Sequence, residues 1–140
     1  MTAVLIGLLA GAMLLIAVAV VPFWRSLPPA EFRRWFFAHS RRIGRMMIPL
    51  GGSTALLSIA ALVASGSGAR YWSIGAALAA IAIGAITLFV NEPANARFAA
   101  TNDLTDTETV ALLQRWVTFH WIRVALGIAG LACAVEAVSR

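Results

Sequence analysis

The fold is decided by one stretch, residues 114–140, which reads QRWVTFHWIRVALGIAGLACAVEAVSR. It is an apolar run long enough to cross a bilayer as a helix, yet it carries Trp116, His120 and Arg123 near its start. Positions three, four and seven apart share one face of a helix, so these three side chains lie together with Gly127. A charged group inside a membrane helix normally turns toward protein or trapped water. The stretch therefore predicts a spanning helix with an inward polar face.

Composition places the whole chain in a membrane. Of its 140 residues 61% are hydrophobic and only 12% are charged, and the mean hydropathy is +0.85. Because a spanning helix needs about 20 residues, the chain has room for four of them and for no separate soluble domain. We predict one all-α domain over residues 1–140, an integral membrane four-helix bundle. Its helices are expected near 3–23, 28–65, 71–90 and 106–138.

Basic residues gather in the connection that follows the first helix. They are Arg25, Arg33, Arg34, Arg41, Arg42 and Arg45, against the single acid Glu31. Connections on the cytoplasmic side of membrane proteins carry an excess of Lys and Arg, so this connection is predicted to be cytoplasmic. With four spans, both termini then lie on the non-cytoplasmic side.

The residues that lead into the second helix predict an amphipathic basic extension. On a helical wheel one side collects Arg33, Arg34, Arg41, Arg42 and Arg45, and the other side is largely aromatic and includes His39. Arginines at this density suit anionic lipid headgroups, each worth about 1 kcal/mol near such a surface. Because the charges flank membrane spans, we infer no nucleic-acid binding from the net charge of +5.

A polar connection joins the third helix to the fourth. Asn91-Glu92-Pro93-Ala94-Asn95 is expected to end the third helix, since the residue before a proline is biased away from helical geometry. Antiparallel neighbours joined by a short loop bring Asn91 and Asn95 to the level of Trp116 and His120. The connection 91–114 is placed in the cytoplasm. Within it, Thr105 and Glu108 have the spacing of a capping box, which predicts a helix start well before the membrane.

Two spaced blocks carry a resemblance to a known family. They are Asn-x-Pro-x-Asn at Asn91, Pro93 and Asn95, and Trp-x3-His-x2-Arg at Trp116, His120 and Arg123. The chain resembles the anthrone-oxygenase-like family over nearly its whole length. These are small four-helix membrane proteins, mostly uncharacterised in bacteria, with fungal members that oxidise polyketide anthrones to anthraquinones without an evident cofactor. The resemblance implies the fold more firmly than the reaction, and it implies a bacterial inner-membrane location.

The polar face suggests a chemistry for a flat hydrophobic substrate such as an anthrone or a polyphenol. His120 would act as the base, because imidazole titrates near neutral pH. Arg123 and the amides of Asn91 or Asn95 would stabilise the enolate oxygen, and the carbanion would react directly with dioxygen, with no cofactor. Gly127 would leave room for the ring and Trp116 would stack on it. The pocket is expected between helices two, three and four.

The sequence leaves other readings open. Arg123 could instead reach the headgroups or pair with Glu92 or Asp103. A haem or metal ion held by His39 and His120 is the second alternative, although continuous helices would place the two about 16 Å apart in depth. The third is a non-catalytic accessory or lipid-binding bundle whose polar cluster only orients helices. A homo-oligomer is compatible with all of these readings.

Overall fold

The computed structural model describes residues 1–100 and 104–140. It forms four long helical segments, called here spans one to four. Span one comprises α1 (Thr2–Leu15), the π turn η1 (Ile16–Val20) and α2 (Val21–Ser26); span two is α3 (Pro29–Ala64); span three comprises α4 (Arg70–Ile86), the π turn η2 (Thr87–Asn91) and α5 (Glu92–Ala99); span four is α6 (Asp106–Ser139). Within the described residues no strand occurs, and each span is long and apolar enough to cross a membrane. The predicted all-α four-helix bundle is confirmed.

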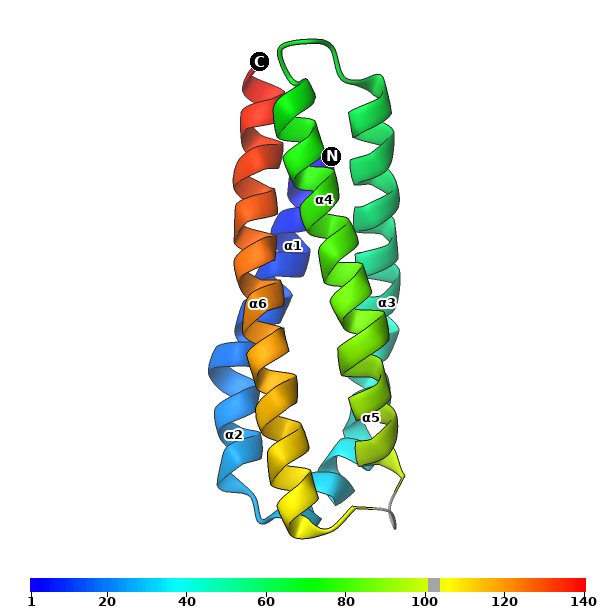
Figure 1. The fold of residues 1–140 in the computed structure, drawn as a ribbon, viewed down its shortest axis with the longest axis vertical. Helices are drawn as coiled ribbons and strands as arrows, with labels where there is room; N and C mark the ends of the chain where they lie inside the picture. The colour runs from blue at the N-terminus through cyan, green and yellow to red at the C-terminus, as the bar shows by residue number, and fades with distance from the viewer. Residues whose placement is uncertain (101–103) are drawn as a thin grey trace.

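The four spans pack as a closed ring in which α6 contacts α4 and α1, while α3 contacts the same two helices from the opposite side. Figure 1 shows both chain termini and the connection between α3 and α4 at one end of the bundle, called here the terminal end. The C-terminal ends of α2 and α5 lie at the other end, called here the basic end. Sequential spans are therefore antiparallel neighbours, as expected for short connections.

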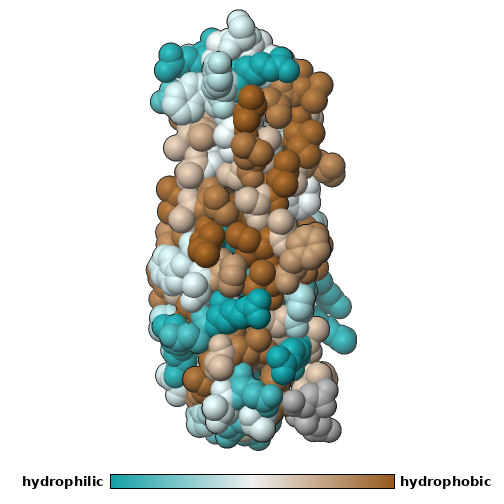
Figure 2. All heavy atoms as spheres, in the orientation of Figure 1, coloured by the Kyte–Doolittle hydropathy of each residue, from teal (hydrophilic) through white to brown (hydrophobic). Residues whose placement is uncertain are grey.

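Apolar side chains are exposed along the middle of the bundle. On the face drawn in Figure 2, hydrophobic residues dominate the central and upper part, and hydrophilic residues gather at the two ends. Large apolar side chains are exposed along the spans, among them Leu56, Leu78 and Leu88. Exposed apolar surface on this scale marks contact with a membrane or another apolar surface. Four such helices are compatible with an integral membrane protein.

The fourth span begins where the sequence predicted. The Thr105 hydroxyl accepts a hydrogen bond from the Glu108 backbone N–H at 3.2 Å, and a Glu108 carboxylate oxygen accepts one from the Thr105 N–H at 2.8 Å. These reciprocal bonds form the capping box and satisfy two of the N–H groups left free at a helix start. The helix then continues without a break to Ser139.

The third span does not end at the Asn91–Asn95 segment, contrary to the sequence expectation. Glu92 keeps helical geometry with φ −65° and ψ −42°, and the helix continues as α5 to Ala99. Pro93 has no N–H, and in a regular helix its ring would clash with the carbonyl four residues earlier. The π turn before it widens the helix, since the Glu92 N–H bonds to Thr87 O, five residues back. The chain therefore accommodates the proline without breaking the helix.

The first span also accommodates a proline by means of a π turn. Pro22 also lies two residues after a π turn, and the Val21 N–H bonds to Ile16 O, again five residues back. The two π turns thus lie in spans one and three, which flank span four on either side. Single π turns inside α-helices occur frequently at functional sites.

Candidate active site

His120 lies in the centre of the polar face of α6 and is fully buried, with 0% of its surface exposed. Its Nε2 lies 2.9 Å from the backbone carbonyl oxygen of Met13, and its Nδ1 lies 2.6 Å from a terminal nitrogen of Arg123. A guanidinium only donates hydrogen bonds and a carbonyl oxygen only accepts them. The imidazole is therefore neutral, with its proton on Nε2 and its lone pair on Nδ1. Both nitrogens are engaged.

Arg123 is a buried cation without a carboxylate partner in the described part of the chain, and 7% of its surface is exposed. One terminal nitrogen donates to the Thr87 hydroxyl at 2.9 Å, and the guanidinium carbon lies 5.7 Å from the centre of the Trp116 ring. Its Nε has no hydrogen-bond partner among the described residues. Glu92, one expected partner, bonds to Asn95 instead; Asp103 lies outside the described residues.

Trp116 joins the predicted asparagines to the histidine. Its ring stacks on His120 with centroids 4.7 Å apart and an interplanar angle of 16°, while its Nε1–H donates to Asn95 Oδ1 at 2.9 Å. The Asn95 amide in turn donates to Glu92 at 2.9 Å. Asn91 is buried and donates to the backbone carbonyl of Trp116 at 3.3 Å, which leaves its own Oδ1 without a described partner. The asparagines were expected at the level of Trp116 and His120, and both bond to Trp116.

Two contributors to the cluster were not predicted from the sequence. Met13 supplies a backbone carbonyl, which no side-chain pattern can indicate, and it lies just before the π turn that accommodates Pro22. Thr87 could have been found, because it lies four residues before Asn91 and so on the same face of the third span. The cluster is therefore built by spans one, three and four, with span three held in place around Pro93 by its π turn.

The space that the sequence assigned to a flat ring beside Gly127 is filled. A Cβ placed on Gly127 would lie 2.9 Å from the Met13 Cε and 3.1 Å from the Ala10 Cβ. Gly127 therefore lets α1 approach α6 closely, which is the packing role of small residues between membrane helices. A ring could enter here only if the Met13 side chain moved and α1 also shifted, because the Ala10 Cα lies 3.3 Å from the same point. Methionine is the side chain best suited to such movement, because it is unbranched and flexible.

Two cavities of the bundle lie away from the histidine, so neither is the substrate pocket predicted between helices two, three and four. A cavity of about 180 Å³ lies at the terminal end and is lined by residues such as Ser58, Ser73 and Ala134. A second cavity of about 90 Å³ lies at the basic end. Neither His120 nor Arg123 lines these two cavities, because spans one and three pack directly against them.

The two histidines do not fit a shared metal or haem site. His39 is exposed, stacks on Trp35 with ring centroids 4.8 Å apart, and its Nδ1 lies 2.9 Å from the Trp35 carbonyl oxygen. The lone pair of His120 already accepts from Arg123, whose charge would repel a cation. No group of three His, Cys, Asp or Glu residues in the described ranges could hold a metal ion.

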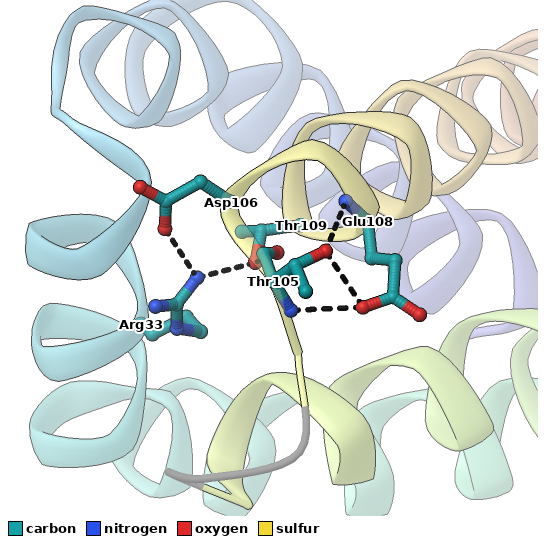
Figure 3. A network of polar contacts seen from close by, with 5 residues as sticks. All are labelled: Arg33, Thr105, Asp106, Glu108 and Thr109. Carbon is teal, nitrogen blue, oxygen red and sulfur yellow. Dashed lines mark hydrogen bonds and ion pairs between the residues drawn. The ribbon is translucent and has the colours of Figure 1, made fainter.

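The basic extension is only partly free to meet lipid. Figure 3 shows Arg33 turned toward the start of α6, where it pairs with Asp106 at 3.1 Å and donates to the Thr109 hydroxyl. Arg33 therefore joins span two to span four at the basic end. The remaining arginines of the predicted lipid-facing set are exposed: Arg34, Arg41, Arg42 and Arg45.

Fold and cluster together define a class: an all-helical bundle of four membrane-length spans with a buried histidine, arginine and tryptophan beside two π turns. The family model described as anthrone oxygenase matches residues 32–133. The chain belongs to the anthrone oxygenase family. No curated protein and no solved structure matches the chain. The family match excludes span one, which nonetheless supplies the carbonyl bound by His120.

Proposed function

We propose that the protein is a membrane-embedded oxygenase that binds a flat, enolisable aromatic ketone of the anthrone type and oxidises it with dioxygen. One observation carries the proposal: the buried Arg123 guanidinium contacts a neutral imidazole and a hydroxyl but no described carboxylate. A charge at the bilayer centre costs about 2.5–3.5 kcal/mol on insertion scales. An enolate oxygen would supply the missing negative charge.

The arrangement also supplies a base in the correct tautomer. When a ketone oxygen draws Arg123 away from His120, the Nδ1 lone pair becomes free beside the bound ring. Nδ1 then takes one proton from the ring CH₂, and the C–H electron pair remains on the substrate as an enolate held by Arg123. The Nε2–H bond to the Met13 carbonyl persists and stabilises the imidazolium.

The oxidation balances without a further reactant. The enolate carbon passes one electron to dioxygen, and the radical pair combines to form a C–O bond and a peroxide anion. The imidazolium of His120 returns its proton to the peroxide anion, which gives a hydroperoxide. The hydroperoxide then loses water, and the former CH₂ carbon becomes a carbonyl carbon. One dioxygen is consumed and one water is released for each anthrone converted to a quinone.

The experiment is oxygen uptake by the purified protein in lipid nanodiscs, with anthrone as the probe and quinone absorbance as the second readout. Arg123→Lys keeps a cation but loses the planar fork, and we expect about 10²–10³-fold slower oxidation, the loss typical of an enolate-stabilising donor. Arg115→Lys is the matched control, because Arg115 is exposed on the same helix. A wild-type rate equal to that of empty nanodiscs, or equal rates in the two variants, would reject the proposal.

A second candidate is a non-catalytic bundle, favoured by the filled space beside Gly127 and by the engagement of both His120 nitrogens. In that case the only role of the cluster is to hold the packed spans in position. The same assay separates the two functions, since a structural cluster produces no oxygen uptake above the lipid blank.

A further inference from the structure

The cavity at the basic end has walls from three different spans. Trp24 and Arg25 line it from α2, Phe32 from α3, and Leu113 and Gln114 from α6. Its volume is about 90 Å³. A cavity of about 150 Å³ is known to hold one benzene ring, so this one suits a smaller group of a few heavy atoms.

Trp24 forms part of this wall and carries a buried donor without a partner. Only 3% of its surface is exposed, and its Nε1–H has no hydrogen-bond partner among the described residues. Its ring is fixed by edge-on contacts, including those with Phe32 at 5.7 Å and Trp116 at 5.3 Å between centroids. A buried indole N–H normally finds an acceptor. The indole N–H of this wall residue is therefore one hydrogen-bond acceptor short.

The polar groups around the cavity favour an acceptor with negative charge. Arg25 and Gln114 add a cation and an amide, and no residue in the wall is acidic. The nearby carboxylate of Asp106 is already paired with Arg33. The Thr109 hydroxyl, also in the wall, donates to the Thr105 carbonyl and accepts from Arg33 (Figure 3). The groups around the cavity that still lack partners are therefore hydrogen-bond donors.

We propose that this cavity binds an anionic oxygen group, a phosphate or a carboxylate, with Arg25 as its main donor and the unpartnered indole N–H of Trp24 beside it. Its place at the end of span one, beside the basic extension, corresponds to headgroup depth in a membrane, where tryptophan and arginine are enriched. The group is the headgroup of an anionic lipid or a free anion of the same chemistry. The inference does not depend on the oxygenase proposal, and Trp24 and Arg25 lie before the family-matched region.

The test follows the indole N–H signals by NMR in nanodiscs. The protein has five tryptophans, and the Trp24 signal is identified by its loss in Trp24→Phe, which keeps the aromatic ring. In neutral phosphatidylcholine nanodiscs the signal is recorded first alone and then with inorganic phosphate. In a third sample, phosphatidylglycerol replaces part of the neutral lipid.

We expect the Trp24 signal to shift far more than the other four, saturably. If only phosphatidylglycerol shifts the signal, the site binds a lipid headgroup. If phosphate shifts the signal as well, the site also binds free anions. Arg25→Gln should weaken binding at least about 5-fold. Arg42→Gln removes the same charge from the exposed basic extension and should leave it within about 2-fold. No shift in either arm, or equal weakening by both variants, would overturn the proposal.

Discussion

Replacing His120 by glutamine separates its proposed catalytic role from its structural role. The glutamine amide offers an acceptor for Arg123 and a donor for the Met13 carbonyl, about as far apart as the two ring nitrogens, but it cannot take a proton. Alanine offers neither. We therefore expect His120→Gln to keep most of the stability and to lose oxidation by about 10²–10⁴-fold, the range for removal of a general base.

The stability difference can be estimated from the contacts of His120. Alanine leaves one N–H of the buried Arg123 guanidinium unpaired, which costs up to about 3 kcal/mol. It also removes a donor from Met13 O, at about 1 kcal/mol, because that carbonyl still accepts from the Ile16 N–H. We expect His120→Ala to lower the free energy of unfolding by about 2–4 kcal/mol and His120→Gln by less than half of that.

The assay combines thermal unfolding, followed by helical circular dichroism, with oxygen uptake on anthrone in the same nanodiscs. His39→Ala serves as the control, since His39 is exposed and both its hydrogen bond and its ring stacking involve Trp35 of its own helix. Full activity in His120→Gln would reject the base assignment. Equal stability losses in the glutamine and alanine variants would show that the two hydrogen bonds do not hold the cluster.

Three further predictions concern packing and topology. Gly127→Ala should destabilise the protein by about 1–3 kcal/mol, because the added methyl forces α1 away from α6, whereas Gly84→Ala, with open space around it, should be neutral or stabilising in the same unfolding assay. Arg33→Gln should cost about 0.2–1 kcal/mol, and less at high salt, as for a partly exposed ion pair; a salt-independent loss would contradict this. In a cysteine-free background, a membrane-impermeant thiol reagent should label Ser67→Cys from the non-cytoplasmic side and Thr107→Cys only after the membrane is opened; the reverse pattern would overturn the predicted topology.

The sequence predicted the features of this fold that depend on side-chain pattern. The capping box of Thr105 and Glu108 set the start of α6 because its two bonds require only those residue types at that spacing. Helical periodicity likewise placed His120 and Arg123 on one buried face. Antiparallel neighbours brought Asn95 to Trp116.

The rest depends on backbone geometry and on packing between spans. Pro93 was expected to end a helix, but the π turn before it lets the helix continue. Nothing in the side chains of residues 87–91 specifies that turn. The Met13 carbonyl has no side-chain signature. Whether Gly127 opens a space or admits a neighbouring helix depends on how closely α1 approaches, which periodicity within α6 cannot determine.

The central claim is that Arg123 and His120 together convert a bound ketone into its enolate, and an anaerobic titration tests it most directly. Anthrone is added to the protein in nanodiscs without oxygen, at a pH where free anthrone stays in its keto form, and the absorption of the enolate is recorded. The account predicts an enolate band that saturates at one ligand per protein, is absent in His120→Gln and is strongly reduced in Arg123→Lys. A spectrum identical to that of anthrone in empty nanodiscs would contradict it.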